Sequence, residues 1–463
     1  MRGGFTRGGR VAKMEQKEGV RSVNIELPPQ AAAALELLSA AGYEAVVVGG
    51  AVRDALRGVS AGDWDIATAA LPEETERVFG RWPLVETGRK HGTVTVLLDG
   101  LPLEITTYRT EGAYTDHRRP DSVRFTASLT EDLARRDFTV NAMAYCPETG
   151  LADPFGGAAD LAAGVLRCVG EPERRFREDA LRILRGLRFA AALGLEAEPA
   201  TARALHGCRG LLPAVSAERV QAELTGLLVG PFAGRVLLEY GDVLAAVIPE
   251  LAPMFGLDQR NPHHDKDLWA HTAAVVDAAP AEPVLRWAAL LHDVGKPPCF
   301  SLGPDGVGHF YGHAGKSAEL ADGILARLRL DNARRGRIAA LIRLHDLPLL
   351  PPDRKQVRRL LNRLGPEGAA ELIALHRADA AGLAAPYRGR VREYAGVQAL
   401  LDSLLAERAC FSLRDLAVKG DDLLALGLRG RAVGEGLNAC LAAVMAEEAP
   451  NDRAALLAWL KDR

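Results

Sequence analysis

The stretch that decides the fold of the first part of the chain is AVVVGGAVRDALRGVSAGDWDIAT, residues 45–68. Its first four residues, Ala45–Val48, are apolar and largely β-branched, which predicts a short buried strand. The two glycines that follow end this strand, and a short helix is expected from Val52 onward. Residues 63–67 then predict a second strand. The order strand, glycine turn, helix and strand indicates a small mixed α/β unit.

The sequence around this stretch extends the unit in both directions. A helix is expected over residues 29–41, behind a pair of prolines. Residues 93–98 and 103–108 alternate between apolar and polar side chains around Asp99-Gly100, which predicts a β-hairpin. The unit is expected to end near Phe155, and helical periodicity dominates the rest. The fold class is therefore α+β, with a small mixed-sheet head followed by an elongated all-α neck, body and tail.

Composition limits the class of protein. The chain has 463 residues, of which 48% are hydrophobic and 25% charged, enough for several domains. A net charge of -3 excludes a globally basic nucleic-acid binder but allows local basic clusters. The six cysteines form no CxxC pair, which favours a cytoplasmic protein over a disulfide framework. No run of about 18 apolar residues is present, so no membrane span is expected.

Two carboxylates, Asp63 and Asp65, stand two positions apart on the second predicted strand, so their side chains share a face. Carboxylate oxygens suit Mg²⁺, which is commonly held by one or two carboxylates together with substrate phosphates. Two such ions would activate an attacking hydroxyl and stabilise a leaving pyrophosphate. Because acidic pairs at exposed strand ends are common, this pair needs support from its surroundings.

The Gly49-Gly50 turn supplies part of that support, since glycine lets backbone N–H groups approach a triphosphate closely. Arg53 follows in the first helical turn, near any phosphate held there. The alternative is a tight turn with an ordinary ion pair between Arg53 and Asp54. Glu104, on a neighbouring predicted strand, is either a third carboxylate near the metals or a residue that orients Arg53 or Arg109.

Two arginine-rich segments follow. RRDFTVNA, residues 135–142, offers Arg136 for phosphate and ribose contacts, or else is a solvated helix end. In residues 178–191, EDALRILRGLRFAA, a polar residue recurs at every third position, which on a helix forms a polar band. The members of this band are Asp179, Arg182, Arg185 and Arg188. The apolar positions expected to face the core are Leu184, Leu187 and Ala191. The alternative is a salt-bridged surface helix.

Together these segments resemble the class II tRNA nucleotidyltransferases, the bacterial CCA-adding enzymes. The matching segments have the family's order and spacing: GGAVRD (49–54), DWD (63–65), LEITTYR (103–109), RRDFTVNA (135–142) and EDALRILRGLRFAA (178–191). The resemblance covers most of residues 40–260. It implies that CCA is added to the 3′ end of tRNA from CTP and ATP, without a nucleic-acid template, by two-metal nucleotidyl transfer.

The resemblance also implies residue roles. Gly50 and Arg53 would contact the triphosphate, and Asp63 and Asp65 would bind Mg²⁺. Arg136 would bind the nucleotide near its ribose and phosphates. The base would be read by an amino-acid template, with further nucleotide contacts along the same segment: Asp179, Arg182, Arg185 and Arg188. A carboxylate accepts from the amino group of C or A, and a guanidinium donates to the adjacent acceptor, whereas U and G present a carbonyl in place of the amino group.

Residues 109–125 resemble the family's flexible loop, which helps the enzyme switch from C to A addition. The presence of this loop argues against an enzyme restricted to CC addition. The loop reads DHRRP at residues 116–120, where the family pattern has Gly in the second place.

A second constellation lies further along, where seven of the eleven histidines fall between His263 and His345. The adjacent pair His292-Asp293 ends an apolar helical pattern, and histidine with carboxylate favours a metal site. This segment resembles the HD phosphohydrolase domain. The resemblance implies one divalent metal held by His271, His292, Asp293 and Asp379. It implies a second metal held by His313 and His345, and a phosphate contact from Lys296. The metal's identity stays open.

The implied HD chemistry is hydrolysis of a phosphoester, including a 2′,3′-cyclic phosphate at damaged RNA ends; a relic domain kept for packing is the alternative.

The predicted domains are a disordered basic arm, a nucleotidyltransferase head, a helical neck, an HD domain and a helical tail. Their predicted bounds are, in the same order, 1–24, 25–155, 156–255, 256–385 and 386–463. Other readings of the whole chain are an A-adding tRNA nucleotidyltransferase, a poly(A) polymerase, an HD phosphohydrolase with an RNA-binding head, and an RNA-binding scaffold.

Overall fold

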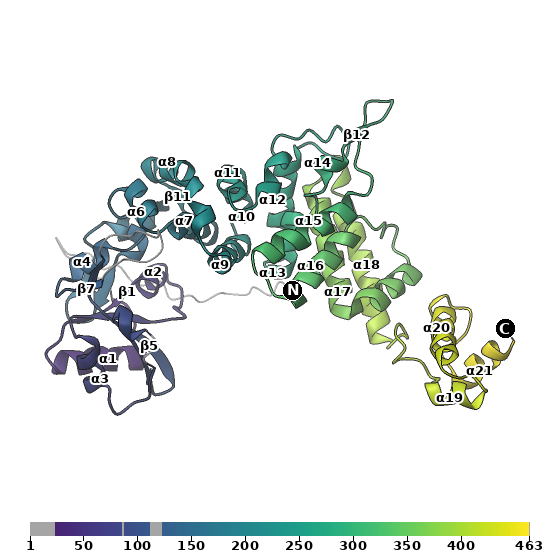
Figure 1. Ribbon diagram of the computed structural model, residues 1–463, viewed down its shortest axis with the longest axis horizontal. Helices are drawn as coiled ribbons and strands as arrows, with labels where there is room; N and C mark the ends of the chain where they lie inside the picture. The colour runs from purple at the N-terminus through teal and green to yellow at the C-terminus, as the bar shows by residue number, and fades with distance from the viewer. Residues whose placement is uncertain (1–23, 86–87, 112–122, 463) are drawn as a thin grey trace, which may run out of the picture. The chain divides into compact units, whose positions relative to one another are not determined.

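The computed structural model describes residues 24–85, 88–111 and 123–462, in two compact units that divide between residues 227 and 228 (Figure 1). The predicted basic arm, up to residue 23, and the central part of the predicted flexible loop, residues 112–122, lie outside the described residues. The division falls within the predicted neck, so the predicted domain boundaries stay predictions.

Unit 1 is built on a seven-stranded sheet with the strand order β3-β4-β5-β2-β1-β8-β9. Only β2 and β5 run parallel in this sheet; its other neighbouring strands are antiparallel. The strand bounds are β1 (Ala45–Val48), β2 (Asp65–Thr68), β3 (Leu84–Val85), β4 (Thr93–Leu98), β5 (Leu101–Thr107), β8 (Ala144–Cys146) and β9 (Gly150–Ala152). Three short pairs of strands complete the structure: β6 (Arg109–Glu111) with β7 (Val123–Phe125), β10 (Val165–Leu166) with β11 (Glu196–Ala197), and, in unit 2, β12 (Ser301–Leu302) with β13 (Gly308–His309).

Alternation along β1 gives the sheet two buried faces. Ala45 and Val47 pack into a core that includes side chains of α1 (Pro29–Ala40) and α2 (Gly50–Leu56). Val46 and Val48 pack on the opposite face, in a core that includes Leu133 of α4 (Leu129–Ala134). Because successive strand residues point to opposite faces, each face of this central strand is apolar.

The expected elements of the head are confirmed with small shifts. The helix expected over residues 29–41 is α1, and the hairpin around Asp99-Gly100 is β4 with β5. The second strand begins at Asp65, two residues later than predicted. α2 begins at Gly50 instead of Val52, because Gly49 takes a left-handed φ of 74° and turns the chain directly into the helix.

The rest of unit 1 is mainly helical, and one prediction about it is wrong. Its helices are α3 (Pro72–Val78), α5 (Gly157–Ala163), α6 (Pro172–Glu178), α7 (Leu181–Leu193), α8 (Pro199–Gly207) and α9 (Ala217–Leu228). Asp179 does not share a helix with the three arginines: it ends α6 in an extended conformation, with φ -136° and ψ 106°. The three apolar positions face the core as predicted, since Leu184, Leu187 and Ala191 are fully buried.

Unit 2 is a stack of helices around the long α17 (Arg354–Gly382), in which Gly365, at φ 71°, interrupts the helical conformation (Figure 1). α12, α13, α16 and α18 pack against it. The other helix bounds are α10 (Ala233–Glu239), α11 (Gly241–Ala245), α12 (Leu268–Ala278), α13 (Pro283–Leu291), α14 (Lys296–Cys299), α15 (His313–Arg327), α16 (Asn332–Leu344) and α18 (Arg390–Ala406). This stack brings residues from α12, α13, α15, α16 and α17 to one place.

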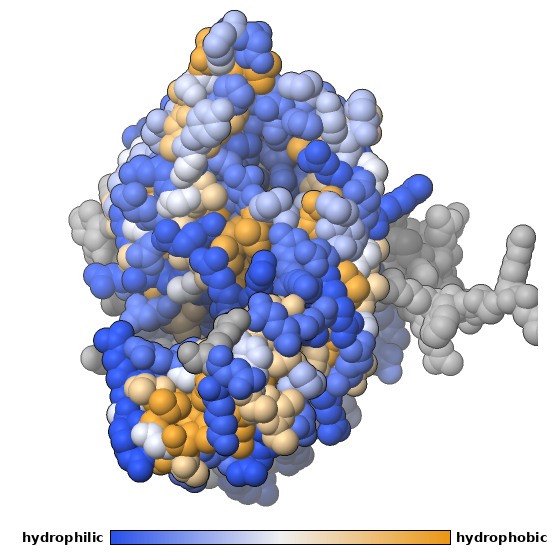
Figure 2. Space-filling model, turned by 90° about the vertical axis from the view of Figure 1, so that its right-hand side faces the viewer, coloured by the Kyte–Doolittle hydropathy of each residue, from blue (hydrophilic) through white to orange (hydrophobic). Residues whose placement is uncertain are grey.

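The last three helices of unit 2 have a small apolar core of their own. They are α19 (Gly420–Ala425), α20 (Arg431–Met445) and α21 (Arg453–Lys461). Leu423, Cys440 and Leu456 are fully buried in this core. Figure 2 views the molecule from the side of these helices and shows a mainly hydrophilic surface with a gathering of hydrophobic residues at its lower end. Across the described part of the chain, none of the helices is long and apolar enough to cross a membrane.

Candidate nucleotide and metal sites

The carboxylates of the head gather at one place on the sheet. Asp65 of β2 stands beside Glu104 of β5 in the parallel register, and both point away from the core that holds Ile66 and Ile105. Asp63, Asp65 and Glu104 are all exposed. Desolvation by the surrounding protein raises the pKa of Asp65; repulsion from Glu104 adds to this effect, and Arg136 opposes it. Negative charge concentrated on oxygen ligands fits a divalent cation, which would relieve the repulsion.

Arg53 on α2 is fixed by two neighbours. Its Nε and Nη2 each donate to the carboxylate of Asp54 at 2.9 Å, and its Nη1 donates to Asn141 Oδ1 at 2.7 Å. The ion pair with Asp54, which the alternative interpretation expected, is therefore present. Arg53 is oriented by Asp54 and Asn141, and not by Glu104. The guanidinium is held beside the Gly49-Gly50 turn.

Position 49 favours glycine chiefly because of its left-handed φ of 74°, and the end of the Arg136 side chain lies close by. A Cβ added to Gly49 would lie 2.9 Å from Arg136 Nη1, in addition to the left-handed φ that Gly49 adopts. Arg136 also reaches Asp132 Oδ2 at 3.5 Å, while its Nε is a buried donor without a hydrogen-bond partner. Burial lowers the pKa of Arg136, and Asp132 opposes this shift. A buried guanidinium donor without a partner, next to the carboxylates, is suited to an anionic ligand.

A buried network links the RRDFTVNA segment to α7. Asp137 accepts from Arg185 Nε at 2.7 Å and from Asn141 Nδ2 at 3.2 Å, so Asn141 joins Asp137 to Arg53. Burial opposes ionisation of Asp137, but Arg185 outweighs burial and holds the pKa of this carboxyl below its ordinary value. The interpretation of this segment as a solvated helix end is therefore wrong, because Asp137 and Asn141 are buried.

One aromatic ring stands among the arginines. The guanidinium carbons of Arg53, Arg185 and Arg188 lie 5.4, 5.5 and 4.6 Å from the ring centroid of Phe189. Phe189 is 5% exposed and packs edge-to-face on Phe138. At these distances a desolvated aromatic ring attracts a guanidinium. Phe189 therefore contacts arginines of both predicted phosphate-binding and predicted base-reading segments.

The predicted base-reading residues are both held by ion pairs. Asp179 Oδ2 accepts from Arg219 of α9 at 2.9 Å, and its Oδ1 accepts from the backbone N–H of Leu181 at 3.1 Å. Arg182 donates to Glu178 at 2.8 Å and to two backbone carbonyls. Arg182 is only 7% exposed. The alternative of a salt-bridged surface helix is correct in its ion pairs but not in its exposure, because Arg182 is buried and Arg185 and Arg188 are only partly exposed.

α9 fixes the far end of the same arginine row. Glu223 accepts from Arg188 Nε at 2.6 Å and lies 3.9 Å from Arg185. Arg219 and Glu223 are one helical turn apart, so a single helix holds Asp179, Arg185 and Arg188. Neither of these α9 residues was predicted from the sequence. Their i, i+4 spacing of opposite charges was the available signal, but spacing alone does not name the partner.

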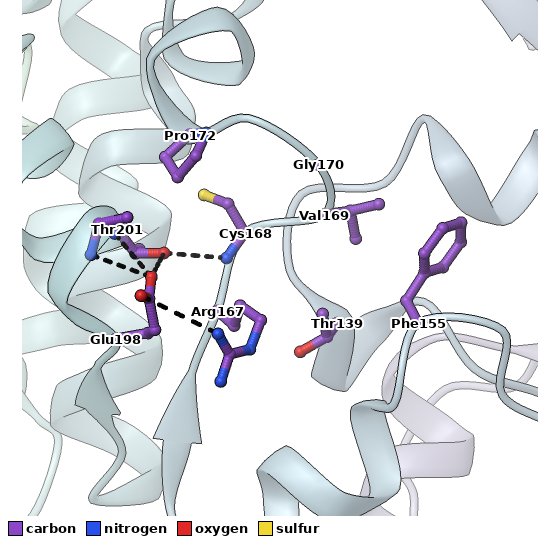
Figure 3. Close-up of a pocket in the computed structure, with 10 residues that line it drawn as sticks. Thr139, Phe155, Arg167, Cys168, Val169, Gly170, Pro172, Glu198 and Thr201 are labelled. Atoms are coloured by element: carbon purple, nitrogen blue, oxygen red, sulfur yellow. Dashed lines mark hydrogen bonds and ion pairs between the residues drawn. The ribbon is translucent and has the colours of Figure 1, made fainter.

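A separate pocket of unit 1 lies outside these contacts. It has a volume of about 320 Å³ and is lined by residues that include Thr139, Phe155 and Thr201 (Figure 3). In the figure, Glu198 accepts from the first turn of α8, and Thr201 accepts from the backbone N–H of Cys168. None of the predicted site residues lines this pocket. The predicted nucleotide-binding residues lie instead around Asp65, Arg53 and α7.

Unit 2 brings the predicted HD ligands together. His271 of α12 lies 3.0 Å from Asp379 of α17, measured from Nε2 to Oδ1, and 3.8 Å from Asp293 Oδ2. His292 Nε2 lies 3.2 Å from Asp293 Oδ2 and 3.8 Å from Asp379 Oδ1. His271, His292 and Asp293 are almost completely buried. His271 Nε2, His292 Nε2 and Asp293 Oδ2 are buried and make no hydrogen bond of acceptable geometry, although they lie within ion-pair distance of charged neighbours. Such atoms are suited to ligate a metal.

A second group shares Asp293 with the first. The Nε2 atoms of His313 and His345 each lie 3.5 Å from Asp293 Oδ1 and 3.2 Å from one another. Each ring places its Nδ1 within 2.7–2.8 Å of the backbone carbonyl three residues earlier, as His292 also does. If Nδ1 carries the proton and donates it to this carbonyl, Nε2 is unprotonated and has a free lone pair. The lone pairs of His313 and His345 then face each other, and a cation placed between them would bind both.

The electrostatics of the cluster also favour a cation. Burial raises the pKa of Asp293, but His292 and Lys296 outweigh burial and hold the pKa well below its ordinary value. Asp379 shows the same balance, with His271 as its main partner. Lys296 Nζ lies 2.7 Å from Asp293 Oδ2 and donates to Gln259 at 2.9 Å. Among the described residues, two sets of three have ligand atoms that all lie within 4.8 Å of one another: His271, His292 and Asp293, and Asp293, His313 and His345.

Comparison with known proteins shows which family contains this combination. Three family models match: "Poly A polymerase head domain" at residues 45–167, "Probable RNA and SrmB- binding site of polymerase A" at residues 194–255, and "HD domain" at residues 269–406. A CCA-adding enzyme of Bacillus velezensis is 36% identical over 433 residues, which is 92% of this chain and 96% of that protein. The chain belongs to the CCA-adding enzyme family.

Other members of the family agree with this assignment. The CCA-adding enzyme of Geobacillus thermodenitrificans is 43% identical over 275 residues, and the chain spans 64% of the length of that relative. The crystal structure of the Bacillus stearothermophilus CCA-adding enzyme in complex with CTP has a TM-score of 0.73 and 31% identity, covering 94% of this chain and 98% of that one. A Thermotoga maritima CCA-adding enzyme complexed with tRNA, at 20% identity and a TM-score of 0.59, shares the fold. The CCA-adding family thus accounts for the mixed-sheet head, the RNA-binding segment and the HD domain.

Proposed function

We propose that this chain adds C, C and A to the 3′ end of tRNA from CTP and ATP, with Mg²⁺ and without a nucleic-acid template. The family membership supports the reaction class. The observation that carries the proposal is the convergence on one face of the sheet of Asp65, Glu104 and Arg136, next to the Gly49-Gly50 turn. Carboxylates for a cation beside donors for phosphate are what transfer of a nucleotidyl group needs. We also propose a cytoplasmic location, which the six free cysteines support.

In this reaction the 3′-hydroxyl oxygen of the tRNA forms a bond to the α-phosphorus of the nucleotide. The bond from that phosphorus to the bridging oxygen of the β-phosphate breaks, pyrophosphate leaves, and the hydroxyl proton passes to solvent. Asp63 and Asp65, with Glu104 beside them, would hold Mg²⁺, which supplies charge neutralisation and activation of the hydroxyl. Arg53 and Arg136 orient the triphosphate, and the glycine turn lets it approach the backbone of α2.

Base choice is assigned to Asp179 and Arg182. A carboxylate that accepts and a guanidinium that donates fit the amino group and acceptor of C and A, and they oppose the carbonyl of U and G. The ion pairs with Arg219 and Glu178 support this role, because they hold the two side chains before a nucleotide arrives. Pre-organised polar groups discriminate strongly, since a wrong base leaves them unpaired.

The test supplies the full chain with tRNA that lacks its 3′ end, together with CTP, ATP or both. We expect two C residues and one A to be added, followed by termination. Addition of A to tRNA that already ends in CC, without addition of C to tRNA that lacks its 3′ end, would indicate an A-adding enzyme, and unlimited A addition would indicate a poly(A) polymerase. Asp65→Asn should abolish addition, with Asp99→Asn, on the exposed β4–β5 turn, as the matched acidic control.

A second activity is favoured by the HD cluster: metal-dependent hydrolysis of a phosphoester. The Nε2 atoms of His292, His313 and His345 are all turned toward the shared carboxylate of Asp293. In the reaction a water oxygen bonds to phosphorus, the ester P–O bond breaks, and the leaving ribose oxygen takes a proton. Metals held by these ligands would supply the activated water. His292→Ala should abolish hydrolysis of a 2′,3′-cyclic nucleotide and leave CCA addition intact; an unchanged hydrolysis rate would contradict the assignment.

A further inference from the structure

An exposed aromatic pair stands on the segment that leads into the HD cluster. Tyr311 is 78% exposed, whereas exposed apolar side chains elsewhere in the described chain, such as Leu302, are about half exposed. Its ring lies parallel to the imidazole of His309, with centroids 5.2 Å apart and an interplanar angle of 10°. Stacking on one face holds the tyrosine ring in a fixed orientation and leaves the other face open to solvent.

This aromatic pair is tied to the metal ligands through the chain. Tyr311 precedes His313 by two residues, so their Cα atoms are at most about 7 Å apart. The residue before Tyr311, Phe310, has its carbonyl oxygen 2.8 Å from His313 Nδ1 and its ring centroid 5.2 Å from Lys296 Nζ. Lys296 in turn contacts Asp293. Tyr311 therefore lies on the segment that directly precedes a ligand of the cluster.

A positively charged side chain, that of Arg260, belongs to a segment that is hydrogen-bonded to the β12–β13 hairpin. Arg260 is exposed, and its carbonyl accepts from the N–H of Gly308 at 2.8 Å, beside the hairpin of β12 and β13, which projects from the helices (Figure 1). Its backbone has a left-handed φ of 47°, a conformation that costs free energy in a residue other than glycine. Within the described chain, its guanidinium makes no ion pair or side-chain hydrogen bond. The preceding residue, Gln259, accepts from Lys296.

We propose that Tyr311, stacked on His309, is a nucleobase platform of the HD site, and that Arg260 contacts the substrate's phosphate. An exposed ring that stacks without hydrogen-bond readout accepts any base, because every base has a π-face. The arrangement therefore selects a nucleoside phosphate, such as the terminal nucleotide of an RNA strand, over a phosphoester that lacks a base. This inference rests on the proposed phosphohydrolase activity for its reaction, but the platform itself is tested by binding.

The first experiment measures hydrolysis by the full chain, with Mn²⁺, of adenosine 2′,3′-cyclic phosphate and of the methyl riboside 2′,3′-cyclic phosphate, which lacks a base. Tyr311→Ala should raise KM for the nucleotide about tenfold, as expected for loss of one base-stacking contact, and leave the riboside unchanged. Tyr311→Phe, which keeps the ring, should stay within about twofold of the parent. Arg260→Met should raise KM equally for both substrates. Leu302→Ala, on the same hairpin, should leave KM for both substrates unchanged.

Equal loss for both substrates in Tyr311→Ala would overturn the platform, and so would an unchanged KM for the nucleotide. An Arg260→Met variant with the parent's KM would overturn the phosphate contact.

A second measurement separates the platform from the hydrolase. The fluorescence of 2-aminopurine riboside 3′-phosphate is quenched when its base stacks. Quenching that persists in Tyr311→Phe and disappears in Tyr311→Ala supports the platform even if no hydrolysis is found with any divalent metal. If the chain hydrolyses the substrate but Tyr311→Ala quenches 2-aminopurine as strongly as the parent, the hydrolase activity is supported and the platform is overturned.

Discussion

Replacing Arg219 by methionine should lower base selectivity without touching a residue that is proposed to contact the nucleotide. Arg219 holds Asp179 Oδ2 at 2.9 Å from the neighbouring helix α9. Methionine keeps much of the unbranched side-chain volume and removes the guanidinium. Asp179 then keeps only the backbone N–H of Leu181 among its described hydrogen bonds, so its carboxylate gains freedom to rotate and to accept different donors.

The magnitude follows from the burial of the pair. The side chains of Arg219 and Asp179 are 29% and 17% exposed, between a surface ion pair and a buried one. Surface pairs contribute about 0–1 kcal/mol and loss of one partner of a buried pair costs about 3–5 kcal/mol, so about 1–2 kcal/mol applies here. If this free energy is lost from positioning Asp179 against the correct base, the ratio of kcat/KM for CTP over UTP falls by about 5- to 30-fold.

The assay is single-nucleotide addition to tRNA lacking its 3′ end, with CTP or UTP alone. Arg219→Lys should recover part of the ratio, because an ammonium keeps the charge but not the geometry of the guanidinium. Arg177→Met is the control, since Arg177 lies on α6 and pairs with Glu173 on the surface. A CTP/UTP ratio that stays at the parent's value in Arg219→Met, while Asp179→Ala lowers it, would refute the positioning role.

Three further changes test other parts of the structure. Phe189→Leu removes the ring that three guanidiniums contact, at about 0.5–1 kcal/mol each, so that loss of all three contacts should raise KM for both CTP and ATP by about 10- to 160-fold; an unchanged KM would contradict a positioning role for this ring. Asp293→Asn should reduce bound Mn²⁺ at both HD groups together, measured by metal content per chain in an Asp65→Asn background that weakens the proposed cation site of the head; retention of one full equivalent relative to that background would disprove the sharing. Burial lowers the pKa of His376 to about 4, so the native state keeps it neutral while the unfolded chain binds a proton below about pH 6.5. Stability from this group is thus complete above that pH and is lost as the pH falls toward 4, so the stability advantage of the parent over His376→Gln, measured by urea unfolding, should shrink by up to about 3 kcal/mol between pH 7 and pH 4.

Local patterns predicted the local elements well. The hairpin around Asp99-Gly100 was predictable because both residues take positive φ values, 45° and 87°, which asparagine-like residues and glycine adopt most readily. The apolar face of α7 followed from its periodicity. Asp179 was misplaced because a three-residue recurrence does not reveal where one helix ends and the next begins. The HD ligands could be predicted only through their resemblance to a family, since five helices bring them together.

The pairing of residues that are distant in the sequence could not be predicted from the sequence. Arg53 and Asn141 are 88 residues apart, and Arg219 and Asp179 are 40 apart. Nothing local selects such partners, because many arginines and carboxylates are available to each. Burial of the polar band on α7 was missed for the same reason: periodicity identifies an apolar face, but it does not show that a second helix covers the polar one.

The sharing of Asp293 between two groups of ligands has a genetic consequence. Because this one carboxylate contacts both pairs of histidines, a single codon change would remove both metal groups at once. A lineage that no longer needed the HD chemistry would lose it in one step, while the helices around it would keep their apolar contacts. Such a chain would still carry His271, His313 and His345, so a survey of homologous genomes that scored histidines alone would count an inactive HD domain as a working one.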